Sequence, residues 1–522
     1  MPDCRSLLFA VFLSLFLAAA PAVHAGQTTR ATAAYAHAPA SGVYYEIFVR
    51  SFYDSNGDGI GDLNGITEKM GYLKSLGVSG IWLTPINPSP SYHGYDVTNY
   101  FAVNPQFGTI DDLRHLVRTA HADGIKVLMD LVINHTSNRN PWFIKAQNPN
   151  SPYHDWYVWA GKHANLKREN PWGDHAWRKA PDGQHYLGVF TSQMPDLNYD
   201  NPAVRREMIK VGQFWLKQGV DGFRLDAAKH IYINFKSDDD NPHAIAKNVA
   251  WWKQFHAAMK KVDPKVFLVG EVSAEQEIQL APYYAALTSV FNFPLADSLI
   301  GSAASERSAD LGARLQRAHR RFDRAAHGTA TDTPFLSNHD QDRVIDQLDG
   351  NREHMRMAAA MLLTLPGDPF VYYGEEIGMR GSKPDPDIRE PMRWDRSADA
   401  PGETRWETDH VNTSADVSVA AERDRPDSLL NFYRTLIHWR RQLPALRDGS
   451  IAPYPADRGP ISAYVRADAA QRLLVVHNLS GKPQQVKLLA GPFTHVIRHT
   501  RKGVQLDGHL LSLPPYSTAI VQ

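Results

Sequence analysis

The chain has 522 residues, of which 43% are hydrophobic and 21% are charged, a composition typical of a globular protein with two or three domains. Lys and Arg together number 56, as do Asp and Glu, so the formal net charge is zero. This balance argues against a basic surface for nucleic acid or an anionic membrane, and we expect neither as a partner.

The first residues, 1–25, are typical of a secretory signal peptide. Leu7 to Ala20 form an apolar run too short to span a bilayer, and a cleavage site follows at Ala25. We therefore expect an exported protein, periplasmic or secreted, without membrane attachment after cleavage, in which residues 26–41 form a linker. The only cysteine, Cys4, would be removed, so no disulfide would remain, and a bound metal is one candidate for stabilising the fold.

Eight segments are predicted to be strands, with helix-like segments between them. The third strand is almost continuously apolar, as expected of a strand covered on both faces. This alternation predicts parallel strands, right-handed crossovers and a closed (β/α)8 TIM barrel. The strands are expected at 43–49, 80–84, 126–133, 220–226, 266–271, 289–293, 333–337 and 369–373, and the clearest helices at 67–76, 111–123, 202–218, 251–262, 352–365 and 428–442.

Two regions depart from this alternation. Residues 136–199 are irregular and rich in aromatic residues, which indicates an inserted B domain after the third strand. After about Gly449, short alternating segments predict a C-terminal antiparallel β-sandwich. The fold class is therefore α/β, with a catalytic barrel of 42–135 and 200–445, domain B of 136–199 and a β-sandwich of 446–522. Sandwich strands are expected at 461–466, 473–478, 485–489 and 517–521.

Polar residues stand at the carboxyl ends of four predicted barrel strands, where barrels of this type carry their active sites. One such end could be a structural ion pair. Four are hard to explain as packing, because charges gathered in one cleft repel one another and lose their hydration. Side chains alternate along a strand, so Arg224 and Asp226 face the same way. The strand ends carry Asn134 and His135, Arg224 and Asp226, Glu271, and Asn338, His339 and Asp340.

Several segments resemble the α-amylase family of glycoside hydrolases, in order and at fitting spacings over nearly all of the mature chain. The resemblance implies a retaining enzyme that cleaves internal α-1,4-glucosidic bonds through a covalent glycosyl-enzyme. The expected partner is an α-glucan such as starch, or a malto-oligosaccharide, and the expected state is a monomer. The matching segments are 130–135, 194–198, 222–226, 270–272 and 335–340.

The resemblance also assigns roles residue by residue. Asp226 would be the nucleophile, and Glu271 the general acid and then the base that activates water, with the two carboxyls about 5–5.5 Å apart. Asp340 would bind sugar hydroxyls and stabilise the transition state, and Arg224 would keep Asp226 ionised. The other expected sugar contacts are His135 and His339 at the cleavage point, Tyr95 as a stacking platform with His93 beside it, and Lys229 and His230 on the leaving-group side.

The substrate is assigned by weighing two sets of resemblances. His93, Ala227 and the Lys229-His230 pair are similar to α-amylases, whereas segments 194–198 and 389–394 are similar to oligo-1,6-glucosidases and neopullulanases. We choose α-amylase. The enzymatic alternatives are an exo-acting α-glucosidase, a neopullulanase or cyclomaltodextrinase, and a 4-α-glucanotransferase. The alternative from another class is a non-catalytic carbohydrate-binding or transporter-associated relative, although such relatives typically lose catalytic carboxylates that this chain keeps.

A loop rich in Gly and Asp places oxygen ligands at alternate positions. Hard oxygen donors around glycine turns suit Ca²⁺, and the loop resembles a stand-alone calcium loop of this family. A solvated acidic turn is the alternative. The expected ligands are Asp54, Asn56, Asp58, the carbonyl of Ile60, and Asp62. The resemblance also allows a second calcium at Asn134, Asp196 and the His230 carbonyl, which relatives with this type of 194–198 segment often lack.

Overall fold

The computed structural model describes residues 41–408 and 410–522. The expected signal peptide, 1–25, and the expected linker, 26–41 except its last residue, lie outside the described residues. In the part of the chain that is described, no helix is both long enough and apolar enough to cross a bilayer.

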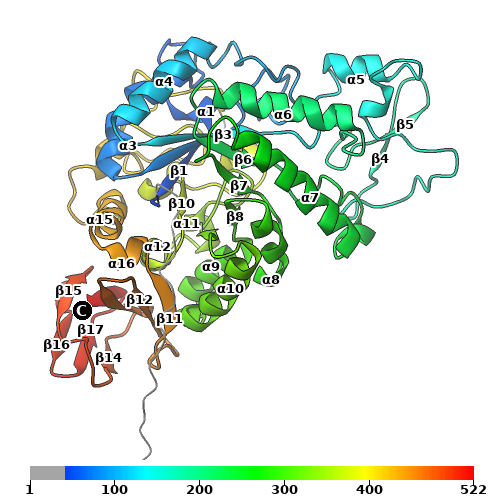
Figure 1. Ribbon diagram of the computed structural model, residues 1–522. Helices are drawn as coiled ribbons and strands as arrows, with labels where there is room; N and C mark the ends of the chain where they lie inside the picture. Colours follow the sequence, from blue (N-terminus) through cyan, green and yellow to red (C-terminus); the bar gives the residue numbers. More distant parts are fainter. Residues whose placement is uncertain (1–40, 409) are drawn as a thin grey trace, which may run out of the picture. The chain divides into compact units, whose positions relative to one another are not determined.

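Eight parallel strands form one sheet in the order β10-β1-β2-β3-β6-β7-β8-β9. The two ends of this order meet, because the Phe370 N–H donates to the Pro334 carbonyl (2.9 Å) and the Asp368 N–H to the Asp332 carbonyl (2.8 Å). The sheet therefore closes into the predicted (β/α)8 barrel (Figure 1). Its strands are β1 (Tyr44–Ile47), β2 (Gly80–Leu83), β3 (Lys126–Leu131), β6 (Gly222–Leu225), β7 (Phe267–Gly270), β8 (Ser289–Phe291), β9 (Thr331–Thr333) and β10 (Phe370–Tyr372).

Helices surround the strands (Figure 1), and their apolar residues are buried. In α4, Leu113, Leu116, Val117 and Ala120 are buried at helical spacing, and a capping box between Thr109 and Asp112 starts the helix. The longer helices are α2 (Leu63–Glu68), α3 (Met70–Leu76), α4 (Ile110–Ala122), α6 (Pro202–Leu216), α7 (Pro242–Met259), α9 (Phe293–Ser305), α10 (Leu311–Ala325), α12 (Arg352–Thr364) and α15 (Leu429–Gln442). Short turns are α1 (Val49–Phe52), α8 (Glu277–Leu280), α11 (Val344–Gln347), α13 (Asp385–Ile388), α14 (Val419–Glu422), α16 (Pro444–Arg447), η2 (Lys236–Asp238), η3 (Ala281–Ala285) and η4 (Glu375–Ile377).

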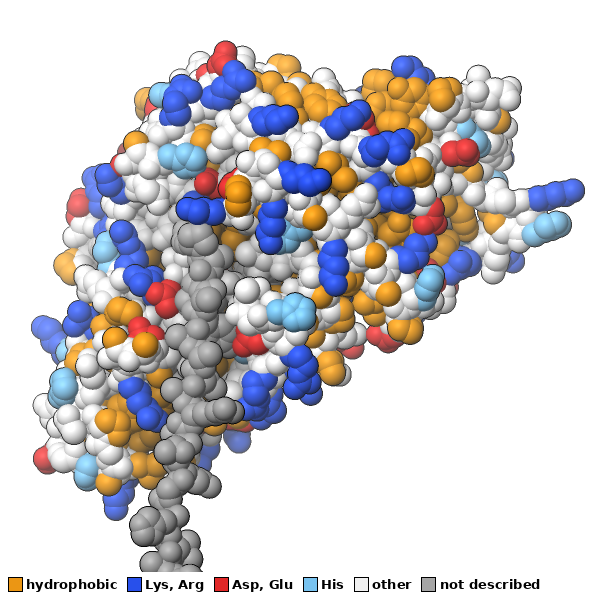
Figure 2. Space-filling model, in the orientation of Figure 1, with side chains coloured by type: hydrophobic (Ala, Val, Ile, Leu, Met, Phe, Trp, Pro, Cys, Tyr) orange, Lys and Arg blue, Asp and Glu red, His pale blue; other side chains and the backbone are white. Residues whose placement is uncertain are grey.

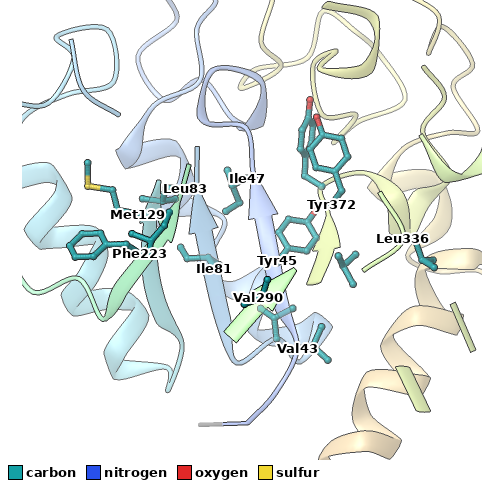
Figure 3. Packing of buried hydrophobic residues seen from close by; sticks show 14 of the residues in the cluster. Val43, Tyr45, Ile47, Ile81, Leu83, Met129, Phe223, Val290, Leu336 and Tyr372 are labelled. Carbon is teal, nitrogen blue, oxygen red and sulfur yellow. The ribbon is translucent and has the colours of Figure 1, made fainter. Parts of the chain in front are cut away.

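Alternate residues of the strands divide between two cores. One set packs outward against the helices, including the Tyr45, Ile81, Met129 and Phe223 side chains of Figure 3. The other set fills the barrel with a largely aromatic layer, composed of Tyr44, Trp82, Leu128, Phe267, Val269, Phe291 and Phe370, and Ala296 of α9 and Phe335 after β9 pack with it. The next positions of this inward set, towards the carboxyl ends, are Glu46, Asp130 and Glu271. The alternation that builds the inner core therefore also places charged side chains at the rim.

Several elements differ from the sequence-based expectation. The seventh strand is expected at 333–337, but β9 spans Thr331–Thr333, because Pro334 has no N–H to continue the ladder. Helix α7 begins at Pro242, nine residues before the expected start, because the Asn241 side chain caps it and proline suits a first helical turn. The helices α9 and α10 are absent from the predicted set.

The inserted segment has little regular structure and a small core of its own. It contains α5 (Pro141–Ala146), η1 (His154–Trp156), and an antiparallel pair of β4 (Trp177–Lys179) and β5 (His185–Leu187). Bridges between His135 and Asp196 and between Tyr157 and Leu197 bring its two ends together. Its core residues Ala176, Leu187 and Val189 pack with Phe235 from the loop after β6. The insertion is thereby fastened to the loop that follows Asp226.

The C-terminal region consists of two antiparallel sheets, as predicted for a β-sandwich. Their apolar side chains, including Val476, Leu511 and Ala519, share one core. The five-stranded sheet is joined to the barrel region by the Tyr464 hydroxyl, which lies 2.7 Å from Thr364 Oγ1 of α12. The strands are β11 (Ser450–Pro453), β12 (Ile461–Ala467), β13 (Arg472–Asn478), β14 (Gln484–Lys487), β15 (Val496–His499), β16 (Gln505–Asp507), β17 (Leu510–Leu513) and β18 (Ser517–Val521).

Candidate active site

One arginine brings together carboxyl groups from neighbouring barrel strands. Arg224 on β6 donates from Nη1 to Asp226 Oδ1 (2.6 Å), and its Nη2 lies 3.0 Å from Glu271 Oε2. The guanidinium is a rigid planar fork, so both carboxyls lie within hydrogen-bond reach of a single group. The side chains expected to act as nucleophile and general acid are thus next to each other at the rim.

The same arginine also holds a third carboxyl. Arg224 Nη1 donates to both oxygens of Asp130, at 2.9 and 3.1 Å, and the Asp130 side chain is fully buried. Burial raises the pKa of Asp130 to about 7, against the opposing charge of Arg224. Asp130 lies in one of the segments that resemble the family, but no role is expected of it from the sequence. We call Arg224, Asp130, Asp226 and Glu271 the Arg224 cluster.

The Arg224 cluster has more carboxyls than its single cation can neutralise. Burial raises the pKa of Asp226, and the charge of Arg224, which the sequence predicts to keep this carboxyl ionised, only partly offsets the rise. Burial also raises the pKa of Glu271, again against Arg224, and the neighbouring charge of Asp226 raises it further. Carboxyls that interact this closely share their protons and titrate together, not one by one. A glutamate with a raised pKa suits a general acid.

The backbone after the nucleophile strand contributes to this arrangement. Ala227 has φ of 46°, in the left-handed region that residues with a Cβ seldom adopt. In this conformation its N–H donates to Glu271 Oε2 at 2.8 Å. Strained backbone is kept mainly where a function depends on it. At Ala227 the strained conformation directs the N–H that orients Glu271, which is consistent with a functional site.

On the opposite side of the rim, a histidine lies between two carboxylates. His339 Nδ1 lies 2.6 Å from Glu46 Oε1, and its Nε2 lies 3.1 Å from Asp340 Oδ2. Burial alone would lower the pKa of His339, but the charges of Asp340 and Glu46 outweigh it and raise the pKa to about 9. His339 is therefore an imidazolium at neutral pH, and both of its nitrogens donate.

Asp340 has a second cation beside it. Arg389, from the loop after β10, donates from Nη2 to Asp340 Oδ1 at 2.8 Å and from Nε to the His339 carbonyl at 2.7 Å. Burial would raise the pKa of Asp340, but the charges of His339 and Arg389 hold it well below its usual range. The side chain is 43% exposed and so remains open to a ligand. We call Glu46, His339, Asp340 and Arg389 the His339 cluster.

Tyr95 links the two clusters. Its ring lies parallel to that of His339, with centroids 5.2 Å apart, and the His93 ring lies 6.1 Å away on a similar plane. Its hydroxyl donates to Asp130 Oδ2 (2.8 Å) and accepts from His339 Nε2 (2.6 Å). The position fits a platform at the bottom of the site.

The remaining expected sugar contacts are partly engaged within the protein. His135 is buried, which lowers its pKa to about 4, and its Nε2–H donates to the Tyr95 carbonyl (2.9 Å). Lys229 Nζ lies 2.7 Å from Asp239 Oδ1. His230 is buried and binds the Ile233 carbonyl through Nδ1 at 2.9 Å, which leaves Nε2 as an acceptor. Hydrogen bonds from these three residues to a sugar remain a prediction.

Comparisons with known proteins agree with this geometry. Residues 46–449 match the family model described as "Alpha amylase, catalytic domain", and residues 461–520 match the "Alpha-amylase SusG C-terminal domain". The chain belongs to the α-amylase family. It is therefore a glycoside hydrolase, and the resemblance drawn from its sequence motifs is confirmed.

Two relatives and one solved structure illustrate the range of this family. "Alpha-amylase 3" of Dictyoglomus thermophilum is 41% identical over 92% of this chain and 93% of its own length. A 4-alpha-glucanotransferase of Thermotoga maritima is 33% identical over 84% of this chain and 96% of its own. The crystal structure of an alpha-amylase from H. orenii is 45% identical with a TM-score of 0.85, covering 92% of this chain and 99% of that one.

In the loop expected to bind Ca²⁺, backbone N–H groups donate hydrogen bonds to carboxylate oxygens of the same loop. Asp54 accepts from the Gly57 and Gly59 N–H groups, both at 2.7 Å, and Asp62 accepts from Ser55 N (2.9 Å) and caps α2 through Gly65 N (2.7 Å). No group of three or more His, Cys, Asp or Glu side chains in the described residues is placed to hold a metal. Carboxylate oxygens keep lone pairs beyond these N–H groups, so the donor chemistry still fits Ca²⁺.

The position considered for a second calcium is occupied by protein hydrogen bonds. The Asn134 amide donates to Asp196 Oδ1 at 2.9 Å, and the Val189 N–H donates to Asp196 Oδ2 at 2.6 Å. Burial raises the pKa of Asp196 to about 7. With the Asn134 amide turned, its oxygen would lie beside the same carboxyl, so a second calcium at this position remains a prediction.

Proposed function

We propose that the protein is a retaining α-amylase that hydrolyses internal α-1,4-glucosidic bonds of starch and malto-oligosaccharides. The observation that carries this proposal is the placement of Asp226 and Glu271 on one guanidinium, since retention requires two carboxyls separated by only about 5–5.5 Å. Relatives that are named α-amylases and match the chain over most of their length support it.

In the first step, an oxygen of Asp226 attacks C1 of the glucose ring while Glu271 donates its proton to the departing glycosidic oxygen. Burial raises the pKa of Glu271, which favours the protonated form that an acid needs, and Arg224 stabilises the carboxylate of Asp226. In the second step, Glu271 accepts a proton from water, whose oxygen attacks C1 and releases Asp226.

The His339 cluster provides a fixed negative charge beside the reacting ring. Asp340 stays ionised because His339 and Arg389 hold its pKa low, so it can accept sugar hydroxyls and stabilise positive charge in the oxocarbenium-like transition state. Tyr95, with His93 beside it, would stack under the sugar. His135 and His339 would contact the sugar at the cleavage point.

The product profile tests this function. Chromatography of early digests of soluble starch should give a mixture of malto-oligosaccharides, and proton NMR should show the α-anomer first. Glucose alone would indicate an exo-acting α-glucosidase. Redistribution of maltotriose without a rise in reducing ends would indicate a glucanotransferase. Pullulan and cyclodextrin assayed side by side separate neopullulanase and cyclomaltodextrinase, and no turnover by the wild type would favour the non-catalytic alternative.

We also propose that the loop of residues 54–62 binds Ca²⁺. Asp54, Asn56, Asp58, the Ile60 carbonyl and Asp62 would hold the ion, which would brace the loop that leads into α2. Metal analysis of the purified protein should find about one calcium per chain, and chelation should lower the melting temperature. Asp58→Ala should remove the calcium and the effect of the chelator together. A melting temperature insensitive to chelation would contradict the calcium proposal alone.

Three further properties are proposed: the domain limits, the cellular location and the oligomeric state. We propose export with cleavage after Ala25, a barrel of 42–135 and 200–445, domain B of 136–199 and a C-terminal domain of 446–522. The zero net charge supports a carbohydrate partner over nucleic acid, and Figure 2 shows basic side chains interspersed with acidic and uncharged ones on one face. N-terminal sequencing of the mature protein and its elution volume as a monomer test these points.

A further inference from the structure

A pocket of about 470 Å³ lies between α3, α15 and the loop that follows β10. Three basic side chains line it: Lys69 just before α3, Arg423 just after α14, and Arg434 within α15. Figure 1 shows α3 next to α15, and Cα atoms of the two helices lie within 8 Å of one another. The described lining residues belong to neither the Arg224 cluster nor the His339 cluster. We call this site the α3–α15 pocket.

The α3–α15 pocket has more basic than acidic side chains. Among its described lining residues Asp395 is the one carboxylate, and its Oδ1 accepts from the Ser397 N–H at 3.2 Å. Arg423 has a second acid nearby, because its Nε lies 3.5 Å from Asp424 Oδ1. Both side chains of that pair are well exposed, at 63% and 81%, and such a pair contributes little. The excess of positive charge therefore favours an anionic ligand.

Lys69 is half-buried against aromatic rings. Its Nζ lies 3.7 Å from the centre of the Tyr53 ring and 4.5 Å from that of the Trp394 ring. Burial lowers the pKa of Lys69, and the charges of Glu403 and Glu68 oppose this shift. Glu403 itself accepts from the Trp394 N–H at 2.9 Å. Ring faces attract an ammonium but accept hydrogen bonds weakly, so the oxygens of an anion would be stronger partners for Lys69.

Arg434 is short of hydrogen-bond acceptors. Its Nη1 donates to Asn431 Oδ1, one turn earlier on α15. Its Nε is buried and, within the described residues, has no hydrogen-bond partner. A buried guanidinium donor without an acceptor is costly. A ligand with several oxygens would supply acceptors, and phosphate offers them in the paired geometry that arginine prefers.

The aromatic part of the wall is held in a fixed arrangement. The rings of Tyr53 and Trp394 cross at 88° with centroids 6.0 Å apart, and the Trp394 indole N–H donates to the Phe52 carbonyl. Pro401 and Val419 extend this apolar surface. The C–H face of a sugar ring packs well against apolar and aromatic surfaces. An anion with a sugar body therefore fits the pocket better than a bare ion does.

We propose that the α3–α15 pocket binds the phosphate monoester of a sugar. Lys69, Arg423 and Arg434 would surround the phosphate, and the sugar would lie against Tyr53 and Trp394. A phosphate monoester carries a charge of about −1.5 to −2 at pH 7, which suits three cations set against one carboxylate. Two sources share this chemistry: a free hexose phosphate, and a phosphorylated glucose unit within a glucan chain. The site does not depend on the proposed hydrolase activity.

Isothermal titration calorimetry of the purified full chain tests the site with four probes: glucose 6-phosphate, glucose, inorganic phosphate, and a maltotetraose phosphorylated at O6 of one glucose unit. Glucose 6-phosphate should bind more tightly than inorganic phosphate, because the wall adds contacts, and at least about tenfold more tightly than glucose. Its affinity should fall as the salt concentration rises. For each probe, the affinity lost in Arg434→Gln isolates the pocket from the active site. Whichever phosphorylated sugar then binds more tightly identifies the source.

Three variants remove one cation each. Arg434→Gln and Lys69→Met should each weaken binding of glucose 6-phosphate about tenfold, the loss of one charged contact, and Arg423→Gln, at an exposed position, about threefold. Arg441→Gln is the matched control and should bind like the wild type, because Arg441 is an exposed arginine on the same helix as Arg434. Melting followed by circular dichroism establishes that each variant is folded.

Unchanged affinity in all three pocket variants, an equal loss in Arg441→Gln, or a wild type that binds glucose as tightly as glucose 6-phosphate would overturn the site. Starch hydrolysis by Arg434→Gln should match that of the wild type, since the pocket lies outside both catalytic clusters. A wild type that binds glucose 6-phosphate as described but does not hydrolyse starch would count against the proposed function alone.

Discussion

The two clusters of the cleft shift the pKa of the carboxyl groups proposed to act on the substrate in opposite directions. In the Arg224 cluster one guanidinium serves Asp130, Asp226 and Glu271, and burial raises all three pKa values. In the His339 cluster, Asp340 lies beside two cations, His339 and Arg389, and their charges hold its pKa low. The same chemical group is thus shifted towards the protonated form on one side and towards the charged form on the other, as an acid and a transition-state stabiliser respectively require.

The largest expected effect comes from breaking the Arg224 cluster. Arg224→Lys keeps the charge but loses the fork that reaches Asp226 and Glu271 together, so kcat should fall by about 10²- to 10³-fold. Steady-state kinetics on soluble starch measure this, with circular dichroism to establish folding. A variant within threefold of wild type would show that the shared guanidinium does not organise the chemistry.

A smaller effect is expected from the other cluster. Arg389→Ala removes one of the two cations that hold the pKa of Asp340 low, so that pKa rises and the acid limb of kcat/KM moves to higher pH. KM should rise as well, because Asp340 binds sugar hydroxyls in its ionised form. A pH profile from pH 3 to 10 checks both. An acid limb identical to that of the wild type would separate Arg389 from Asp340.

The smallest effect of the three is expected at the buried end of the His339 cluster. The pKa of His339, about 9, lies above its ordinary value, so the imidazolium is present below that pH and is lost as the pH rises through it. Glu46→Gln removes one carboxylate that supports this charge, so the alkaline limb of kcat/KM should move to lower pH by about one unit.

The same substitution carries a stability signature. The contribution of the His339 charge to folding is fully present below the unfolded pKa of about 6.5 and disappears as the pH rises through about 9, so Glu46→Gln should reduce the melting temperature more at pH 6 than at pH 10. Glu207→Gln, on α6 beside Lys210, is the control. Equal losses at both pH values would argue for a packing role only.

The alternation of side chains along the strands predicts which residues reach the rim of the barrel. Alternation along strands places Arg224 at the rim, and the same rule applies to Glu46, two residues after Tyr44, and to Asp130, two after Leu128. A charged residue within a strand that is otherwise buried is a signal in the sequence for such a position. Glu46 and Asp130 both belong to the inward-facing set, so both reach the clusters.

Contacts between loops have no such periodicity. Arg389 is 49 residues beyond Asp340, in a loop whose course the sequence does not determine, and it still becomes the closest cation to that carboxylate. Lys229 is similar, because its expected sugar contact competes with Asp239, ten residues later in an irregular loop. The limits of β9 depend on Pro334, whose missing N–H ends the ladder earlier than hydrophobicity suggests.

The central claim is that Asp226 attacks the sugar while Glu271 supplies and removes protons. The most direct test incubates Glu271→Gln with α-maltotriosyl fluoride, whose leaving group needs little acid assistance, and maps the quenched protein by mass spectrometry. Without a base to activate water, the glycosyl-enzyme should accumulate, with one maltotriosyl group on the peptide that contains Asp226. Turnover without any adduct, or an adduct on another residue, would contradict the account.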